Sequence, residues 1–479
     1  SNSPAATTAA EGNKTDPAYT PGFEMPIDYW IVKVDADGNH VWDNDLHAKD
    51  YDILYSVAQT TDGGYILGGA SPSENLGPVE KTAPKIGQYD YWLVKLDANG
   101  NSQWQQTYGG VEDDFLMEVQ QTPDGGYILT GYTEYLSTGG FGSRDGLVIK
   151  VDQNGAVQWQ KILGSSGADI LIDALQTADG GYLFAGASDG GGNPAGGKTD
   201  PSFGSFDMWL VKTDAGGNIQ WNKTIGGASE DLASDILQIP DGGFAVAGLS
   251  ESLPGTGNKT APNYGGSDYW LVKLDAAQQI QWDQSYGGIY HDAGDNDQLI
   301  VQKFVKMVRT PDGNYFLGGS SMADGLAGAS ISPTKSAVGY GNVDFWTVYT
   351  DPQGNYLWDK AWGGTMVDNF NAIVQTNEGG YAIAGHSNSH PTDTKSQFPF
   401  DSELHDYWVI RISDTTSCDH RNICFRWVEW PNLDSLTHVF EPWTCEEITA
   451  DALRTALDHL TYEYKKDRLD AFEADYLNT

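Results

Sequence analysis

The sequence predicts an all-β fold: a six-bladed β-propeller of four-stranded antiparallel blades, followed by a small helical C-terminal tail. Three observations predict it. One strand pattern, Asp-aromatic-Trp followed by alternating apolar residues, recurs along the chain. Glycine is abundant, with 58 residues, and so are tryptophan and tyrosine, with 16 and 25, which suits short strands, tight turns and large buried rings. A repeat of about 60 residues holding four strands is typical of a propeller blade.

The recurring pattern opens seven strands, 55 to 76 residues apart. These openings are Asp28, Asp90, Asp145, Asp207, Asp268, Asp344 and Asp406, of which Asp145 begins a degenerate copy. A turn and a lone tryptophan follow the first six, at Trp42, Trp104, Trp159, Trp221, Trp282 and Trp358. Each unit then continues with a Gly-Gly corner, an acidic residue, a strand, an Asp-Gly-Gly turn and a strand of small residues, so it holds four strands joined mostly by hairpins.

The strand types predict their own places in a blade. Residues 269–274 are largely apolar on both faces, as expected of a strand that is covered on both sides. The strand around Trp282 alternates polar and apolar residues and suits an outer edge. Strands of small residues, such as 244–248, suit the crowded region nearer the axis of the ring.

The two chain ends are expected to close the ring over residues 1–413. Residues 12–17 resemble 257–262 and 197–201, which are loops between two strands of one blade. We therefore expect the N-terminus to donate two outer strands to a blade whose inner strands lie near 368–386, which leaves the strand at 406–413 surplus. Seven blades, the first of them incomplete, are the alternative.

The repeats resemble those of a known group of proteins. Residues 90–97 (Asp-Tyr-Trp-Leu-Val-Lys-Leu-Asp), the Tyr-Gly-Gly at 108–110 and residues 121–129 (Gln-Thr-Pro-Asp-Gly-Gly-Tyr-Ile-Leu) look like the repeats of Bacteroidota secreted and cell-surface β-propellers, many of which the type IX secretion system exports. The resemblance covers residues 1 to about 413. It implies an extracellular or outer cell-surface location and carries no catalytic motif. Such exported proteins usually end in a β-rich sorting domain, which this C-terminus does not resemble.

The tail, residues 414–479, differs in composition from the repeats. All glycines precede Ser413 and all three cysteines follow it. Residues 423–443 are aromatic and irregular, and residues 444–464 show a capping box and helical apolar spacing, which predicts an amphipathic helix. We expect this helix to pack on its own chain; the alternative is that it docks a partner protein. A disulfide between Cys418 and Cys424 is plausible outside the cell, as is one from either to Cys445.

Charge excludes two classes of partner. The formal net charge is −39, although charged residues make up only 19% of the chain. Such a field repels nucleic acid and anionic lipid, so we expect neither as a partner. Because the sequence contains no run of about 18 apolar residues, we also expect no membrane insertion.

Candidate binding residues are expected where the repeat loses its symmetry. Residues 289–297 lengthen one corner and concentrate His291, Asp292, Asp295 and Asp297, which suit a divalent cation or sugar hydroxyls. The competing interpretation is a solvated acidic loop. Long loops before the third strands carry lysines at Lys14, Lys81, Lys198 and Lys259. We expect these lysines on one rim of the ring, where loops often bind ligands, unless each pairs with nearby acids.

Residues copied with every blade are expected to be structural. An aspartate follows most Gly-Gly corners, at Asp52, Asp114, Asp169, Asp231 and Asp368. These carboxylates either line the channel as a cation site or cap their own turns, and repetition favours capping. Asp35, Asp37 and Asn39 belong to a tight hairpin turn rather than a calcium loop. We therefore expect no cofactor, with calcium as the one candidate.

The sequence favours an extracellular, non-catalytic module that binds glycan or protein at the cell surface as an adhesion or scaffold element. The alternative is a polysaccharide-acting enzyme, a hydrolase or lyase, with carboxylates near the central channel. A third interpretation is a spacer between other domains. No Gly-x-Ser-x-Gly, phosphate loop or His-Glu-x-x-His motif is present in the sequence.

Overall fold

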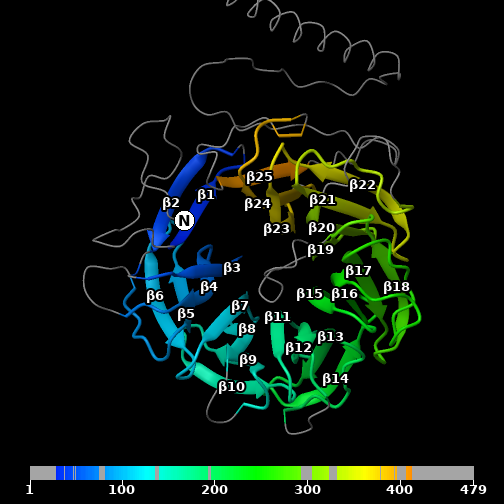
Figure 1. Ribbon diagram of the computed structural model, residues 1–479. Coiled ribbons are helices and arrows are strands. Elements are labelled where there is room, and N and C mark those ends of the chain that lie inside the picture. The colour runs from blue at the N-terminus through cyan, green and yellow to red at the C-terminus, as the bar shows by residue number, and fades with distance from the viewer. Residues whose placement is uncertain are drawn as a thin grey trace, which may run out of the picture. The chain divides into compact units, whose positions relative to one another are not determined.

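The computed structural model describes residues 28–412, apart from residues 37, 47, 49, 75–80, 135–139, 192–195, 293–304, 323–331, 378, 393 and 396–405. These residues belong to the first of two compact units, Ser1–Asn432, and the second unit, Leu433–Thr479, lies outside them. The described chain is an all-β, six-bladed propeller of mainly four-stranded antiparallel sheets, as the sequence predicts (Figure 1).

Each blade begins with two inner strands. The first strands, which lie nearest the centre of the ring in Figure 1, are β3 (Ile53–Gln59), β7 (Asp114–Gln121), β11 (Asp169–Gln176), β15 (Asp231–Gln238), β19 (Val305–Arg309) and β23 (Asp368–Gln375). The second strands are β4 (Tyr65–Ser71), β8 (Tyr127–Glu134), β12 (Tyr182–Ser188), β16 (Phe244–Ser250), β20 (Tyr315–Met322) and β24 (Tyr381–Ser387). The strands of small residues are therefore inner strands, as expected.

The outer half of each repeat is a second hairpin. Its third strands are β1 (Tyr29–Val34), β5 (Asp90–Leu96), β9 (Arg144–Val151), β13 (Asp207–Thr213), β17 (Asp268–Leu274), β21 (Val343–Thr350) and β25 (Asp406–Ile412). The fourth strands are β2 (His40–Leu46), β6 (Ser102–Tyr108), β10 (Val157–Leu163), β14 (Ile219–Ile225), β18 (Ile280–Tyr286) and β22 (Tyr356–Trp362), at the outer edges of the sheets.

Among the described residues, five blades have four strands, and the sixth, β23-β24-β25, has three. A separate two-stranded sheet, β1-β2, stands in the ring between the sixth blade and the first; we call it the half-blade (Figure 1). The Tyr407 hydroxyl of β25 donates to the Trp30 carbonyl of β1 at 3.0 Å. The Tyr29 hydroxyl of β1 donates to the Trp92 carbonyl of β5 at 3.3 Å. The same kind of hydrogen bond joins complete blades, so the half-blade continues the ring.

The expected closure of the ring is wrong in its pairing. We expected β1 and β2 to complete the blade whose inner strands are β23 and β24. Instead β25 pairs with β24 in register, with Gly385 opposite Trp408, so the strand at 406–412 is not surplus. The reason is that β25 carries the same Asp-Tyr-Trp opening as β1 and follows β24 in sequence, so its pairing closes a shorter loop.

The hairpin turns between third and fourth strands also join neighbouring blades. Gly100 has φ +88°, a conformation that favours glycine. A Cβ on this residue would lie 3.1 Å from the ring of Trp42 on the neighbouring sheet. The same contact joins Gly155 to Trp104, Gly217 to Trp159 and Gly354 to Trp282, so the lone tryptophan of a fourth strand and the glycine of the next turn form one contact that the sequence shows only as separate signals.

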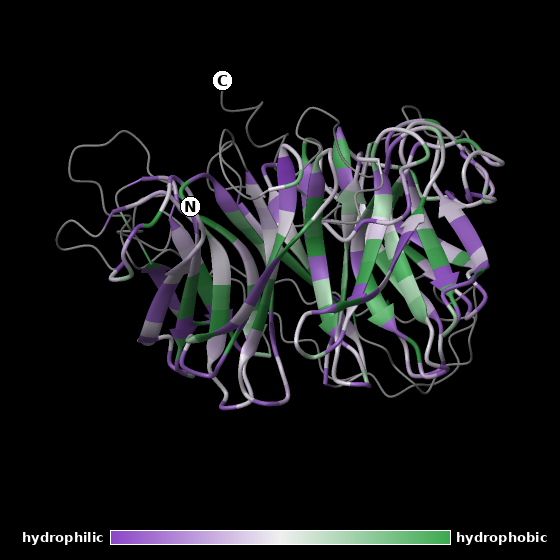
Figure 2. Ribbon diagram, turned by 90° about the horizontal axis from the view of Figure 1, so that it is seen from below, coloured by the Kyte–Doolittle hydropathy of each residue, from purple (hydrophilic) through white to green (hydrophobic). Residues whose placement is uncertain are grey.

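The hydrophobic core lies between neighbouring blades. One cluster joins Leu249 and Leu271 of the fourth blade to Val305, Leu317 and Trp346 of the fifth. Figure 2 shows hydrophobic residues along the strands and hydrophilic residues mainly in the turns and at the outer edges. Because each sheet is covered on both faces, every blade depends on both of its neighbours.

Glycine in the second strands gives the first testable prediction. A Cβ on Gly186 would lie 1.9 Å from the carbonyl oxygen of Ile170 on the adjacent strand. We expect Gly186→Ala to lower the free energy of unfolding by about 1–3 kcal/mol, because the backbone of β11 must move. Gly191→Ala is the matched control, since nothing lies within 4 Å of a Cβ there. Urea denaturation of both variants checks this, and equal stabilities would contradict it.

Candidate functional site

The lysines that were expected on a rim lie inside the blades. Lys81, Lys198 and Lys259 are buried. The Lys259 ammonium group lies 4.5 Å from the centre of the Trp270 ring, and the other two lie over the third-strand tryptophans of their own blades. The long lysine stem packs within the blade while its charge rests on the indole face. These three lysines therefore lie inside their blades, and their ammonium groups donate to hydroxyl groups, those of Ser71, Thr224 and Ser285.

Each of these three lysines, like Lys335 and Lys395, lies near two aspartates, one after the Gly-Gly corner and one at the start of the third strand; the aspartates are buried, except for the half-buried Asp406. We call this group the blade cluster. In the fifth blade the Nζ of Lys335 lies 2.6 Å from Oδ1 of Asp292 and 2.7 Å from the Ser321 hydroxyl. The clusters are Asp52, Asp90 and Lys81; Asp169, Asp207 and Lys198; Asp231, Asp268 and Lys259; Asp292, Asp344 and Lys335; and Asp368, Asp406 and Lys395.

The corner aspartates cap their own turns, which confirms the structural interpretation of these residues. The Gly227 N–H donates to Asp231 at 2.7 Å, and the Ser252 hydroxyl donates to the same oxygen at 2.7 Å. Asp292 accepts in the same way from the Gly288 N–H. Asp292 is thus the corner aspartate of its blade, and the symmetry of the repeat extends further into residues 289–297 than the sequence suggests.

Burial controls the charge state of the blade clusters. It raises the pKa of Asp268 to about 7, with a further contribution from Asp292, and raises the pKa of Asp52 and of Asp344 to about 7. Burial lowers the pKa of Lys198 and of Lys259 to about 8. These shifts arise because a low-dielectric interior disfavours the charged form of either group. The shifted pKa values of these aspartates and lysines therefore arise from the blade cluster, which recurs from blade to blade.

His291 lies near acidic side chains at one end of the ring. Its Nδ1 accepts from the Ser267 N–H at 3.2 Å and lies 3.9 Å from the Glu251 carboxylate. The Glu251 N–H donates to the Glu230 carbonyl at 2.8 Å, which brings the two glutamates to one place. Burial, followed by Glu251 and Asp231, raises the pKa of Glu230. Neither glutamate was singled out from the sequence, because neither belongs to a recurring motif.

A second feature at the same end of the ring is a set of apolar side chains. The antiparallel order of strands puts the loops before the third strands and the Gly-Gly corners at one end, which we call the loop rim. One apolar residue in each described loop donates its N–H to the third-strand aspartate four positions later, at 2.6 to 2.8 Å. These rim residues are Ile86, Phe141, Phe203, Tyr264 and Tyr340. Ile86, Phe203 and Tyr340 are exposed, and the other two are half-buried.

The rim residues have a sequence signal of their own, although they do not break the symmetry of the repeat. Each is followed by glycine, four positions before the Asp-aromatic-Trp aspartate. The structure explains that glycine: a Cβ on Gly142 would lie 1.7 Å from the Gly167 carbonyl of the next corner. The backbone of the loop thus packs directly against the Gly-Gly corner, and the third-strand aspartate holds the loop by accepting a hydrogen bond from its backbone. The same backbone hydrogen bond thus holds an isoleucine, phenylalanine or tyrosine side chain at the loop rim of each of these five blades.

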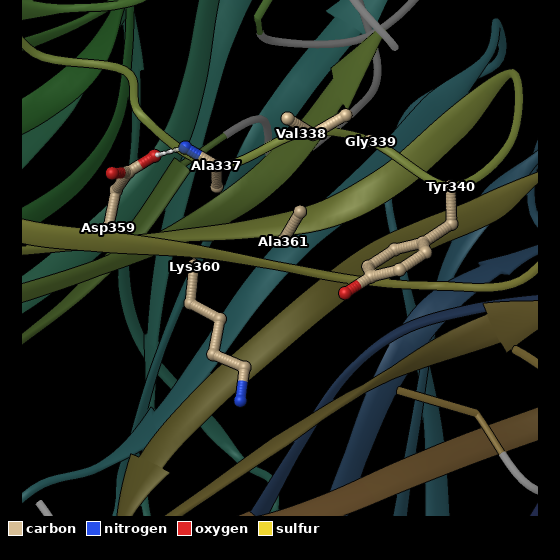
Figure 3. Close-up of a pocket in the computed structure, with 7 residues that line it drawn as sticks. All are labelled: Ala337, Val338, Gly339, Tyr340, Asp359, Lys360 and Ala361. Atoms are coloured by element: carbon tan, nitrogen blue, oxygen red, sulfur yellow. Dashed lines mark hydrogen bonds between the residues drawn. The ribbon is translucent and has the colours of Figure 1, made fainter. Parts of the chain in front are cut away.

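Figure 3 shows a hollow at the loop rim beside one of these residues. It has a volume of about 350 Å³ and is lined by residues 337–340 of the loop and 359–361 of β22. The Ala337 N–H donates to Asp359 at 2.8 Å, and the Tyr340 ring and the Lys360 side chain flank the opening. An aromatic ring, an amine and an aliphatic wall form an adaptable contact surface for a polar ligand.

Polar contacts between first strands join neighbouring blades. Lys306 of β19 and Asp235 of β15 form an ion pair at 2.9 Å, and Asp235 also accepts from the Met307 N–H at 2.7 Å. Asp173 of β11 accepts from the Ile236 N–H at 2.9 Å in the same way. Carboxylates of the first strands therefore join the third blade to the fourth and the fourth blade to the fifth.

Several predicted residues lie outside the described residues: Lys14, Asp295, Asp297, Cys418 and Cys424, together with the helical tail. Across the described part of the chain, no helix has the length and apolar character needed to cross a membrane. Within the same residues, no group of three or more His, Cys, Asp or Glu side chains is arranged to hold a metal ion. The turn aspartates serve their own backbone; Asp35 accepts from the Asn39 N–H at 2.8 Å.

No protein-family model matches the chain, and no curated protein matches it in sequence. Among solved structures, it is similar to a protein of unknown function from Bacteroides caccae, with 12% identity, a TM-score of 0.36 and coverage of 67% of this chain and 85% of that one. A protein of unknown function from Dyadobacter fermentans DSM 18053 shares 12% identity, with a TM-score of 0.39 and coverage of 72% and 93%. Trypanosoma rangeli sialidase shares 9%, with a TM-score of 0.36 and coverage of 79% and 56%.

Proposed function

We propose that this propeller is an extracellular, non-catalytic module that binds a glycan or a protein at the cell surface through its loop rim. The observation that carries the proposal is the set of rim residues, one apolar side chain per described loop, each fixed by the same backbone hydrogen bond. Exposed apolar and aromatic side chains on a rigid scaffold are typical of binding surfaces. The extracellular location rests on the resemblance of the repeats to those of secreted propellers.

The chemistry of the rim supports recognition of an extended ligand. Ile86, Phe203 and Tyr340 come from three different blades and differ in size and polarity, while their backbones make the same hydrogen bond to the third-strand aspartate. A ligand that spans several blades meets a different side chain at each one. Such a surface gives specificity through many weak contacts, which suits a polymer such as a glycan chain or the surface of a folded protein.

The rim variants test this proposal. We expect Phe203→Ala and Tyr340→Ala each to weaken binding of the full chain by about tenfold, the loss typical of an aromatic contact residue. Leu357→Ala is the matched control, because Leu357 is equally exposed but lies at the opposite end of the ring, next to the β21–β22 turn. A broad glycan array with the wild-type chain identifies the ligand class, and affinities are then measured on the glycan that binds.

Two outcomes would contradict the glycan assignment. Binding that falls equally in the Leu357 variant would remove the rim from the site. Absence of glycan binding, together with a purified surface protein whose binding both rim variants abolish, would assign the rim to protein instead.

One observation favours a polysaccharide-acting enzyme as the second candidate. The raised pKa of Glu230 beside Glu251 is the kind of asymmetry that a general acid and its partner carboxylate require. Release of sugar from a polysaccharide that is lost on Glu230→Gln, with binding retained, would establish this activity and overturn the non-catalytic proposal.

A further inference from the structure

A row of stacked aromatic rings lies at the junction between the first blade, β3–β6, and the second, β7–β10 (Figure 1). The Tyr89 ring stacks on the Phe115 ring with their centres 5.1 Å apart, and Phe115 stacks on Tyr132 at 5.2 Å. The interplanar angles are 23° and 21°, so the three rings are nearly parallel. The Arg144 guanidinium lies 5.6 Å from the centre of the Tyr132 ring and pairs with Glu134 at 2.7 Å. The row thus runs from the loop of the first blade into the second.

This aromatic row is not copied with the repeat. Phe115 and Tyr132 form a cross-strand pair between β7 and β8. The equivalent pairs of four other blades contain no phenylalanine, tyrosine or tryptophan: they are Ile53 and Ala70, Ile170 and Ala187, Leu232 and Leu249, and Asn369 and His386. Residues that recur in every blade serve the fold, so rings that depart from the repeat indicate a role specific to this junction.

Polar groups border the aromatic rings. Burial, followed by the neighbouring Tyr89, raises the pKa of Tyr55 to about 12, and burial followed by Tyr55 raises the pKa of Tyr132. The three hydroxyls therefore lie near one another, and within the described part of the chain they make no hydrogen bond. The Asp113 carboxylate accepts from the Tyr89 N–H at 3.0 Å, which places it beside the same ring. Hydroxyl groups and a carboxylate thus stand next to the ring faces.

Part of this surface faces solvent, and its charge is negative. Tyr51, next to the corner aspartate of the first blade, is 50% exposed. Burial raises the pKa of Tyr89, and so do, in decreasing order, Asp113, Asp52, Asp50 and Tyr51. These groups therefore lie near the Tyr89 hydroxyl. Because three of them are carboxyl groups, the surface disfavours an anionic ligand.

We propose that this junction is a subsite for one neutral sugar residue of a glycan, whose C–H face stacks on Tyr89 and whose hydroxyls hydrogen-bond to Asp113 and Tyr55. The weakly positive C–H groups of a pyranose ring pack on the negative face of an aromatic ring, and its hydroxyls need donors and acceptors around that face. The inference rests on the proposed function, binding at the loop rim, and adds the chemistry and the place of one ligand unit.

Two other ligand classes fit the junction less well. An acidic sugar, such as a uronic acid, brings a carboxylate against Asp50 and Asp113, and like charges in contact oppose binding. A proline-rich peptide also packs on aromatic rings, but its pyrrolidine rings carry no hydroxyl groups for the Asp113 carboxylate. Both classes are therefore used as comparison ligands.

The probes are neutral hexose oligosaccharides, a uronic-acid oligosaccharide and a proline-rich peptide, each titrated into the full chain by calorimetry. We expect saturable binding of a neutral oligosaccharide, and binding of the acidic one that is weaker by about tenfold or more. Saturation-transfer NMR, with irradiation of the aromatic protons of the protein, is expected to label the C–H protons on one face of the bound sugar ring.

Variants of the full chain test the aromatic contact. Tyr89→Ala is expected to weaken binding of the neutral oligosaccharide by about tenfold, the loss typical of an aromatic contact residue. Tyr89→Phe keeps the ring and is expected to keep the NMR transfer, which separates loss of the ring from loss of folding. Phe206→Ala is the matched control, because Phe206 holds the equivalent half-buried position before the third-strand aspartate of the third blade. It should leave the affinity unchanged.

Several results would overturn the subsite: no binding of any neutral oligosaccharide, tighter binding of the acidic oligosaccharide or of the peptide, or equal losses in the Tyr89→Ala and Phe206→Ala variants. Failure of the proposed function gives a different result. Phe203→Ala and Tyr340→Ala would then leave glycan binding intact, while Tyr89→Ala would still weaken it. Binding that is lost only in those two rim variants would keep the proposed function and remove the subsite.

Discussion

Lys335→Ala is expected to destabilise the propeller by about 3–5 kcal/mol, the cost of leaving a buried carboxylate without its partner. The Lys335 ammonium lies 2.6 Å from Asp292, and the two side chains are 3% and 0% exposed. The same ammonium lies 5.3 Å from the centre of the Trp346 ring, in the core between two blades. Urea denaturation followed by tryptophan fluorescence measures the loss.

The matched control is Lys273→Ala. Lys273 pairs with Asp241 at 2.5 Å, but the Asp241 side chain is 52% exposed. Solvent screens this pair, so we expect a loss of about 0–1 kcal/mol. The Lys335 variant should also lose less stability at about pH 5 than at about pH 8, because the isolated Asp292 can then take up a proton. Similar losses in the two variants would contradict a buried blade cluster.

The second large effect is on pH dependence: the propeller is expected to become more stable, not less, between about pH 8 and about pH 5. Burial raises the pKa of Asp52, Asp268 and Asp344 to about 7, and raises the pKa of Asp114 and Asp207 to about 6, from the ordinary aspartate pKa of 3.8. A carboxyl whose pKa is higher in the folded state binds its proton on folding. Its contribution to stability is therefore fully present below the unfolded pKa and is lost as the pH rises through the folded one.

Each buried carboxyl group makes a large contribution to the change in stability. A carboxyl such as Asp268, with a folded pKa of about 7, contributes on the order of 2 kcal/mol between these two pH values. Asp268 faces Asp292, Lys259 and Lys335, and the two lysines lower its pKa. Lys259, with a folded pKa of about 8, titrates at the upper limit of this window and therefore offsets only a small part of the effect.

Thermal denaturation across this pH range checks the prediction. The net charge of −39 also favours the protonated, less repulsive chain, so the series is repeated at about 1 M salt, where surface repulsion is screened and the buried groups are not. Asp268→Asn should flatten the remaining pH dependence. A stability that falls on mild acidification, or an unchanged slope in this variant, would show that the buried carboxyls are ionised in the folded state.

The sequence could predict only part of the candidate site, because the rest depends on packing between strands and turns that are distant in sequence. The lysine and aspartate of each blade cluster recur visibly, yet their burial depends on a tryptophan from another strand and on two turns from different sheets. Sequence spacing places Lys259 and Asp268 in a loop and at a strand start; only packing puts the Lys259 ammonium on the Trp270 ring. The rim residues were missed because their signal, an apolar residue before glycine, acquires meaning only beside the corner backbone.

The sequence by itself determined the repeat, the four strand types, their inner and outer places and the structural role of the corner aspartates. These follow from local periodicity and turn chemistry, which act within a few residues. Tertiary structure alone decided which strand completes the last blade and which lysines are buried. β1 and β25 share the Asp-Tyr-Trp opening, so local preference cannot choose between them. The shorter connection from β24 and the packing of neighbouring sheets choose β25, and among the described strands β1 pairs with β2 in a separate sheet.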